Sequence, residues 1–312
     1  MKTQTNRTTK ARSGFTLLEL MIVIVIIGVL VALFFPAIRG IFQRGEQAKV
    51  AAELTQLDQS LQAFHTRFQE YPPSSLIIPI VGGTWSSQDR GKVRGLWPEF
   101  NFATNGGLQN DGMAGRPGEI KLNGAECLVF FLGGLQNRDT SAPVIAGFSK
   151  NPKTPWTISE NSDGPFMEFD LGRVSDMDGD LIFEYLDPIA GQTAPYMFIS
   201  AGGKTMNKDN DNYLSSLAPQ SDPLVASDDD YDVFTDATLN MSSCYLQPDD
   251  NNTGSDAANN QPYRKDSFQL ISPGEDGEYG TGGIWQSGGT VTAGRENEID
   301  NVTNFSSGTL GE

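Results

Sequence analysis

Residues 15–38 of this chain read FTLLELMIVIVIIGVLVALFFPAI, and these 24 positions contain a single charge, that of Glu19. A helix rises about 1.5 Å per residue, so the segment would reach about 36 Å and could cross a hydrocarbon layer about 30 Å thick. Arg12 stands before the segment and Arg39 stands after it. Because basic residues crowd its N-terminal side, the N-terminus is expected in the cytoplasm and the rest of the chain outside.

Three other kinds of N-terminal segment fit less well. A cleaved signal peptide has an apolar region of about 7–15 residues followed by a small-residue cleavage site, whereas this region is longer and no such site follows. A lipoprotein signal needs a cysteine at its cleavage point, and none stands here. An ordinary signal anchor would not place Glu19 in the apolar run, because a carboxylate there is costly unless it is paired.

Cleavage between Gly14 and Phe15 would give Glu19 a partner. The cut frees an α-amino group on Phe15 and makes Glu19 the fifth residue of the processed chain. The amine of one subunit could then pair with the carboxylate of a neighbour inside a bundle of apolar helices. Such a pair would also fix the axial register between subunits.

The stretch SGFTLLELMIVIVIIGVL at residues 13–30 resembles the prepilin-type cleavage and methylation signal of type IV pilins and of type II secretion and competence pseudopilins. The resemblance implies that a membrane-embedded prepilin peptidase removes the basic leader 1–14 after Gly14 and N-methylates Phe15. It also implies that residues 15–38 serve both as transmembrane helix and as polymerisation helix. Pro36 stands where many members carry a proline, and together with Gly28 it marks either a weak stretch of the assembly helix or an ordinary membrane-helix Gly and Pro.

Residues 39–71 read as an amphipathic continuation of the helix. Its apolar residues recur at steps of mostly three and four and end before Tyr71-Pro72-Pro73, a sequence that terminates helices. The chain's only histidine, His65, lies near this stripe and is interpreted as a packing residue. The predicted apolar stripe comprises Ala48, Leu54, Leu57, Leu61, Phe64 and Phe68.

Residues 72–312 are predicted to form a globular extracytoplasmic head. We expect a long irregular connection over 74–125 and a buried run over 127–132 that is helix or strand. Short apolar runs over 181–185, 196–200 and 268–271 predict strands of a small antiparallel sheet packed on the helix. Residues 205–262 carry eleven Asp against one basic residue and read as an inserted acidic loop. The expected fold class is therefore α+β and pilin-like, with long loops.

The charge of the chain is unevenly distributed. The leader holds four basic residues and no acid, so removing it from a chain of net charge −17 leaves −21. A body this acidic is repelled by nucleic-acid phosphates and anionic headgroups, so no nucleic-acid partner is expected. Cys127 and Cys244 are too few for a structural zinc site, and export would permit a disulfide between them.

Two segments could bind a cation through oxygen. Residues 176–180 place three Asp at alternate positions, which suits either Ca²⁺ or an ordinary turn, but Leu181 and Asp187 stand where an EF-hand needs Gly and Glu. Residues 272–281, SPGEDGEYGT, and 298–301, EIDN, resemble the C-terminal loop of type II secretion major pseudopilins, which implies one bound calcium. The resemblance gives Asp276 and Asp300 as side-chain ligands and Ser272 and Asn301 as carbonyl candidates. The chain departs from the family at Gly282-Gly283, where acids are common, and in a longer segment over 282–297.

The sequence therefore predicts a structural subunit of a type II secretion-like pseudopilus and not an enzyme. The family implies other copies of the chain, minor pseudopilins, prepilin peptidase and an inner-membrane assembly platform as partners. The subunit would be stored as a single-pass protein of the bacterial inner membrane and then enter a periplasmic filament. A type IV pilin or minor pilin is the alternative. A membrane-anchored binding protein or carboxylate-dependent hydrolase belongs to a different class, although no catalytic triad, phosphate-binding loop or His-pair metal motif supports it.

Overall fold

The computed structural model describes residues 16–79, 83–110, 119–134, 136–137, 144–157, 159–177, 182–201, 244–248, 262–288 and 294–311. Over 35–41 it describes the helical backbone only. The chain forms two compact units, and the boundary between them falls inside the first helix, between Glu46 and Gln47. The first unit contains the apolar part of this helix, and the second contains its remainder and the head.

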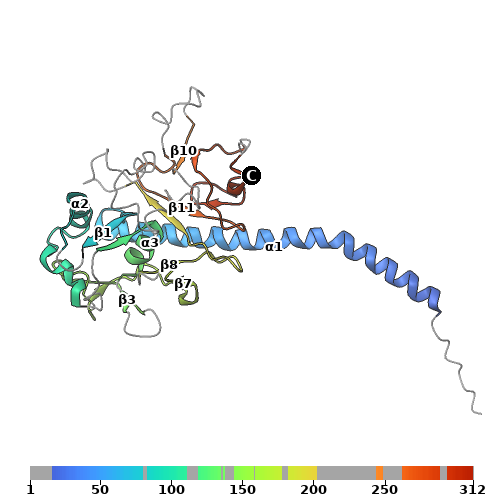
Figure 1. Ribbon diagram of the computed structural model, residues 1–312, viewed down its shortest axis with the longest axis horizontal. Helices are drawn as coiled ribbons and strands as arrows, with labels where there is room; N and C mark the ends of the chain where they lie inside the picture. Colours follow the sequence, from blue (N-terminus) through green and yellow to red (C-terminus); the bar gives the residue numbers. More distant parts are fainter. Residues whose placement is uncertain are drawn as a thin grey trace, which may run out of the picture. The chain divides into compact units, whose positions relative to one another are not determined.

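Helix α1 runs from Leu17 to Phe68 and confirms the long N-terminal helix predicted from the sequence (Figure 1). It begins with a capping box, in which the Thr16 hydroxyl accepts from the Glu19 amide at 3.2 Å and the Glu19 carboxylate accepts from the Thr16 amide at 3.0 Å. It ends where Gln69 takes a φ of 63° and donates its N–H to the His65 carbonyl at 2.7 Å. The prolines that follow prevent the helix from continuing.

The half of α1 inside the head buries one stripe of apolar side chains. Leu54, Leu57, Leu61 and Phe64 are all at most 2% exposed, as predicted. The prediction was wrong at Ala48, which is exposed, while Val50 is buried. Val50 lies four residues before Leu54 and on the same face, whereas Ala48 lies six residues before it, about 240° around the helix.

The central sheet of the head is small and antiparallel. Strand β11 (Phe268–Ser272) lies between β9 (Met197–Ser200) and β13 (Val302–Thr303) and pairs antiparallel with both. Helix α3 (Gly124–Gly133) packs beside β9, and a side chain at Gly124 would collide with the Phe198 carbonyl. The α+β, pilin-like class with a small antiparallel sheet is thereby confirmed.

The remaining elements are short. The antiparallel pairs are β1 (Leu76–Pro79) with β2 (Glu119–Leu122), β3 (Gln136–Asn137) with β4 (Val144–Ile145), β5 (Phe148–Ser149) with β6 (Ser162–Asp163), and β7 (Val174–Ser175) with β8 (Glu184–Tyr185). Strands β10 (Tyr245–Leu246) and β12 (Gly283–Ile284) pair in parallel. Helix α2 spans Ser87–Leu96, and the 3₁₀ helices η1, η2 and η5 span Phe102–Asn110, Leu171–Arg173 and Glu296–Glu298.

The structure corrects the expectation for residues 74–125 and decides between helix and strand for residues 127–132. Residues 74–125 do not form one irregular connection, because they contain β1, α2 and β2. The buried run over 127–132 is helical and belongs to α3. Its N-terminus carries a full capping box between Asn123 and Glu126, and Gly134 follows its C-terminus. These local signals outweigh the β-propensity of a Val- and Phe-rich run.

The predicted acidic insert over 205–262 includes a segment that belongs to the apolar interior of the head. Residues 205–243 and 249–261 lie outside the described residues, but Cys244, Tyr245 and Leu246 are buried in a second apolar cluster. Cys127 belongs to the main core, and neither cysteine forms a disulfide. The disulfide that export would permit is not formed in this structure, because the two thiols lie in separate clusters.

Replacement of Phe64 by Ala tests the attachment of α1 to the head. The Phe64 ring is fully buried and contacts Phe68, Phe131 and Phe166, with ring centroids 4.4, 6.0 and 5.2 Å away. We expect Phe64→Ala to lower the free energy of unfolding by about 3–5 kcal/mol, since it leaves a large cavity. Denaturant unfolding in detergent measures this, with the exposed Gln59→Ala as control; a loss below about 1 kcal/mol would contradict it.

Candidate functional site: the start of the helix and the C-terminal loop

Glu19, one of the predicted assembly residues, lies in the first turn of α1. Oε2 of Glu19 accepts hydrogen bonds from both the amide and the hydroxyl of Thr16, each at 3.0 Å, so the carboxylate is held at the first turn. Gly14 and Phe15 lie outside the described residues. Gly28 is helical, with no atom within 4 Å of the position that a Cβ would occupy. Pro36 lies within α1, and its side chain lies outside the described residues.

The apolar part of α1 has the properties of a membrane span. Leu17–Phe34 is long and apolar enough to cross a bilayer, and its side chains are exposed. A soluble protein seldom exposes a continuous apolar surface of this size. The segment therefore needs lipid or other apolar helices around it.

A hydrogen-bond network around the carboxylate of Glu53, which the sequence did not indicate, joins α1 to the rest of the head. Glu53 accepts from the Tyr185 hydroxyl at 2.7 Å, from the Tyr196 hydroxyl at 2.8 Å and from Arg173 Nη1 at 2.9 Å. Burial raises the pKa of both tyrosines, and the adjacent Glu53 carboxylate raises it further, so both hydroxyls remain donors. The carboxylate thus accepts four hydrogen bonds, the fourth from the other terminal guanidinium nitrogen of Arg173, and they fix α1 against η2, β8 and the residue before β9.

Two further ion pairs fix the same helix. Asp58 pairs with Arg264 at 3.0 Å, and Arg67 pairs with Asp163 at 2.6 Å. The partners lie far apart in sequence, so no local pattern could have indicated them. Because these side chains are partly exposed, each pair stabilises the head only weakly, and their common effect is to orient α1.

The structure brings the two predicted calcium-ligand side chains together. Oδ2 of Asp300 accepts from the amides of Glu275 and Asp276 at 2.6 and 3.2 Å, while Asp276 accepts from the Glu278 amide at 2.8 Å. Gly274 has a φ of 68°, and a Cβ there would lie 2.5 Å from the Asp300 carboxyl carbon. Burial, with help from the charge of Asp300, raises the pKa of Asp276 to about 6. The Asp300 carboxylate thus binds the backbone of the turn that carries Asp276.

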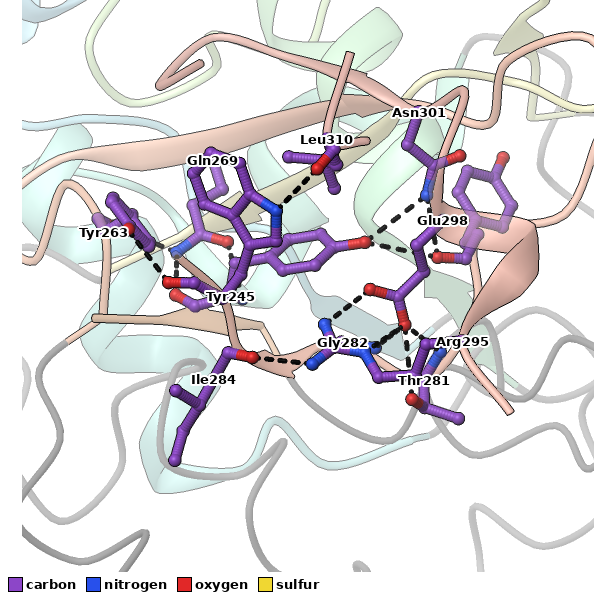
Figure 2. Close-up of polar contacts among 12 residues, drawn as sticks. Tyr245, Tyr263, Gln269, Thr281, Gly282, Ile284, Arg295, Glu298, Asn301 and Leu310 are labelled. Carbon is purple, nitrogen blue, oxygen red and sulfur yellow. Dashed lines mark hydrogen bonds and ion pairs between the residues drawn. The ribbon is translucent and has the colours of Figure 1, made fainter. Parts of the chain in front are cut away.

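The second half of the loop is held by a buried ion pair, which the sequence did not reveal (Figure 2). Glu298 is 1% exposed, and its Oε1 accepts from the amides of Thr281 and Gly282 at 2.9 and 3.1 Å. Arg295 binds the same carboxylate at 2.5 and 2.9 Å and donates to the Ile284 carbonyl at 2.6 Å. Arg295 therefore places a positive charge beside Gly282. Gly282 itself stands where the resemblance implies that an acid is common.

The side chains of Ser272 and Asn301, the two residues predicted to act through their carbonyls, make hydrogen bonds inside the head. The Ser272 hydroxyl donates to Asp187, and the Asn301 amide donates to the Tyr279 carbonyl at 2.9 Å and to the Tyr245 hydroxyl at 3.3 Å. Asn301 Oδ1 is buried and, among the described residues, has no hydrogen-bond partner. Within the part of the chain that the structure describes, no group of three or more His, Cys, Asp or Glu side chains could hold a metal ion. Asp178 and Asp180 of the other candidate segment lie outside that part.

Asp187 makes the stability of the head depend on pH. It is 2% exposed, and burial raises its pKa to about 6 although it accepts from Ser272 and from the Ile189 amide. The folded chain therefore binds this proton more tightly than the unfolded chain does, and the free energy of unfolding should fall as pH rises from about 4 to about 6. The free energy of unfolding lost over this pH range is at most about 3 kcal/mol.

Unfolding measured from pH 4 to pH 7 tests this expectation. Asp187→Asn should flatten the fall with pH relative to the unchanged chain. Asp276 contributes in the same direction, so Asp276→Asn is measured alongside it. An equally steep fall in Asp187→Asn would assign the pH dependence to other groups.

Comparison with known proteins identifies the family. Residues 9–35 match the family described as prokaryotic N-terminal methylation motif. The type II secretion system core protein G of Pectobacterium carotovorum subsp. carotovorum is 31% identical over 110 residues, which make up 33% of this chain and 70% of that protein. The chain belongs to the type II secretion system core protein G family.

The matches to other relatives cover a smaller share of those proteins. The core protein G of Escherichia coli (strain K12) is 36% identical over 69 residues, or 22% of this chain and 48% of that protein. The type IV major alpha-pilin of Moraxella bovis is 33% identical over 102 residues, or 31% of this chain and 64% of that protein. The chain thus spans about half the length of several curated relatives that it matches. No solved structure matches it significantly.

Proposed function

We propose that this chain is a structural subunit of a type II secretion pseudopilus, assembled from the bacterial inner membrane. One observation carries the proposal: an exposed apolar helix, Leu17–Phe34, contains a carboxylate five residues after a prepilin-type cleavage point. Membership of the core protein G family supports it. The role is assembly, not catalysis.

Assembly would follow from the chemistry of the helix start. Cleavage after Gly14 exposes the amine of Phe15, which pairs with Glu19 of a neighbouring subunit and offsets the cost of burying both charges. The apolar segments then leave the lipid and pack against each other. The membrane anchor of the stored subunit becomes the core of the filament, and the head stays outside the membrane as the positive-inside rule predicts.

Electron microscopy of filaments sheared from cells that express the chain with a type II secretion system tests the proposal. Antibodies against the head should label the filaments along their length. Labelling confined to filament ends would assign the chain to a minor subunit, and unlabelled filaments would refute the proposal. The 33% identity to a type IV major alpha-pilin keeps a type IV pilus subunit as the second candidate. A retractile surface pilus that carries the label would favour it.

The C-terminal loop is proposed to bind one Ca²⁺. The residues fit such an ion in part. Asp300 binds the backbone of the turn that carries Asp276, so two carboxylates belong to this loop, and the charge of Asp300 helps to raise the pKa of Asp276. Calcium takes six to eight oxygen ligands, so carbonyl oxygens of the loop would complete the set. When bound, the ion neutralises the two carboxylates and so stabilises the turn.

Thermal unfolding of the full chain in detergent tests the calcium proposal. Calcium at about 100 times its Kd should stabilise the unchanged chain by about 2.7 kcal/mol relative to chelator. The double variant Asp276→Asn with Asp300→Asn should lose this response, while Glu278→Gln should keep it. Equal melting temperatures of the unchanged chain in calcium and in chelator would exclude a structural ion.

A further inference from the structure

Helix α2 presents a basic and aromatic surface on an acidic protein. Arg90 and Arg94 are exposed and lie four residues apart, so they share one side of the helix. Their guanidinium carbons lie 4.8 and 5.3 Å from the centre of the Phe102 ring. This ring is half-buried and packs edge-on against Trp85, with 5.2 Å between the ring centres. We refer to Arg90, Arg94 and Phe102 as the arginine face.

The two arginines of this face form no ion pair with any residue that the structure describes. The other arginines described in the head behave differently. Each of them pairs with an Asp or Glu of the head or of α1: Arg67, Arg173, Arg264 and Arg295. In a chain with a net charge of −17, two exposed guanidinium groups without a carboxylate partner are an exception that calls for a ligand.

The surroundings of the arginine face are also basic. Residues 84–108 hold three basic residues against two acids, and one of these acids, Asp89, is buried 3.7 Å from Lys92. Residues 144–157 hold two lysines and no acid, and they lie beside the face, because the Asn101 amide donates to the Lys153 carbonyl at 3.0 Å. The two segments together carry a net charge of +3, whereas the chain as a whole is strongly negative.

The chemistry of the face selects carboxylates on an extended chain. A guanidinium group stacked on a ring is held in place and presents its N–H donors in a plane, which suits bidentate binding of a carboxylate. A nucleic acid or an anionic membrane would also meet the negative charge of the rest of the body and be repelled. An extended acidic polypeptide can contact the small basic surface alone, so it is the ligand that fits.

The chain itself contains such a segment. Residues 222–236 read DPLVASDDDYDVFTD, with six Asp and no basic residue, and they lie outside the described residues. The chain leaves the described part of the head after Ala201, close to α2. The Ser200 amide donates to the Ser74 hydroxyl at 2.9 Å, and the carbonyl of the next residue, Ser75, accepts from Lys92 of α2 at 2.7 Å. The 21 residues from Ala201 to the acidic segment can span up to about 70 Å, so α2 is within reach.

We propose that the arginine face is a docking surface for the acidic segment 222–236 of the same chain. A short flexible tether gives a segment an effective concentration of about a millimolar. The acidic segment of another copy has no such advantage, and copies of this negative charge repel each other. The inference concerns the isolated subunit and does not rest on the proposed function.

Peptide binding tests the chemistry of the face. The probe is a fluorescent peptide with the sequence of residues 222–236, added at low salt to the full chain in detergent. The internal competitor is weakened in the full chain by replacing four acids with Asn: Asp228, Asp229, Asp230 and Asp232. This chain should bind the probe, and a peptide in which the same four Asp are Asn should bind at least roughly tenfold more weakly, since hydrogen bonds to charged groups are the stronger ones.

Removal of the two arginine charges locates the binding. Arg90→Gln with Arg94→Gln should weaken probe binding at least roughly tenfold. Arg44→Gln with Lys49→Gln removes two exposed charges from α1 and should leave binding unchanged. Equal binding by the arginine variant and its parent would overturn the proposal. So would binding of anionic phospholipid vesicles through these arginines without binding of the peptide.

Cysteine pairs test whether the docked segment belongs to the same chain. Both native cysteines are buried, so introduced cysteines react selectively. Ser227→Cys with Ser87→Cys, which is exposed about 60° around α2 from Arg90, should form a disulfide within one chain under mild oxidation. Gln88→Cys is exposed about 160° from Arg90 and is the matched control. Its disulfide with Ser227→Cys should form at least several times more slowly.

The products of this oxidation decide the outcome. Salt at about 1 M, where the screening length is about 3 Å, should remove the difference between the two cysteine pairs. Equal rates for the two pairs at low salt would overturn the proposal. Disulfide-linked dimers in place of the product within one chain would also overturn it, because the segment would then dock on another copy. Neither experiment uses filaments, so its failure leaves the proposed function standing.

Discussion

Glu19→Leu should abolish incorporation of the chain into filaments while leaving its membrane insertion intact. The substitution makes the segment uniformly apolar, so insertion becomes more favourable by a few kcal/mol. In the filament, however, the amine of Phe15 would lose its partner and remain as an unpaired charge among apolar helices. Breaking a buried pair in this way costs about 3–5 kcal/mol at every subunit contact. Because the contact recurs along the filament, the expected result is no detectable polymer.

Two variants separate the charge from its local role in the helix. Glu19→Gln can still accept the Thr16 amide, which Glu19 binds at 3.0 Å, but it carries no charge. It should fail like Glu19→Leu if the intersubunit ion pair is decisive. Leu20→Ala changes the neighbouring residue without altering charge and should assemble. Fractionation of cells into membrane and sheared-filament pools measures both properties, and normal assembly of Glu19→Leu would refute the proposed mechanism.

Gly14→Trp should block processing almost completely. The resemblance to prepilins places the cut between Gly14 and Phe15, and a residue without a side chain before the cut lets the backbone approach the peptidase closely. A chain that is not cut keeps its 14-residue basic leader and has no amine at Phe15. The precursor should accumulate in the membrane and form no filament.

Mass spectrometry of the membrane pool measures this effect. The unchanged chain should begin at N-methylated Phe15, and Gly14→Trp should retain Met1 or the residue after it. Ser13→Ala, one position earlier, is the matched control and should be processed. Efficient cleavage of Gly14→Trp after residue 14 would show that the peptidase does not require glycine here. Processing at another position would show that the resemblance misplaced the cut.

The elements predicted well are those whose signals are local. The apolar run over 15–38, the end of the helix at Pro72-Pro73 and the strands near 196–200 and 268–271 each follow from periodicity, composition and turn residues within a short window. The resemblance also named Asp276 and Asp300 together, and in the structure Asp300 accepts from the Asp276 amide, while their role as calcium ligands stays a prediction. The error at Ala48 was one of helical phase, since that residue lies off the face defined by Leu54 and Leu57.

The contacts that were missed join residues distant in sequence. Glu53 meets Arg173, 120 residues away, and Asn304 donates to Asp58 across 246 residues. Such pairs depend on how the sheet packs against α1, which no local pattern encodes. The disulfide stayed open at the level of the sequence for the same reason, because two cysteines in one chain do not indicate whether the fold places them in one cluster or in two.

The sequence by itself therefore determined that the chain has a membrane-length helix with one acid, an N-terminal methylation motif and a C-terminal loop with two acids. These properties follow from hydrophobicity, charge and spacing along a single segment. Tertiary structure alone decided that Glu298 pairs with Arg295 and that the side chains of Ser272 and Asn301 turn into the interior. Those outcomes depend on burial and on partners from distant segments, and burial is defined only when the whole chain has folded.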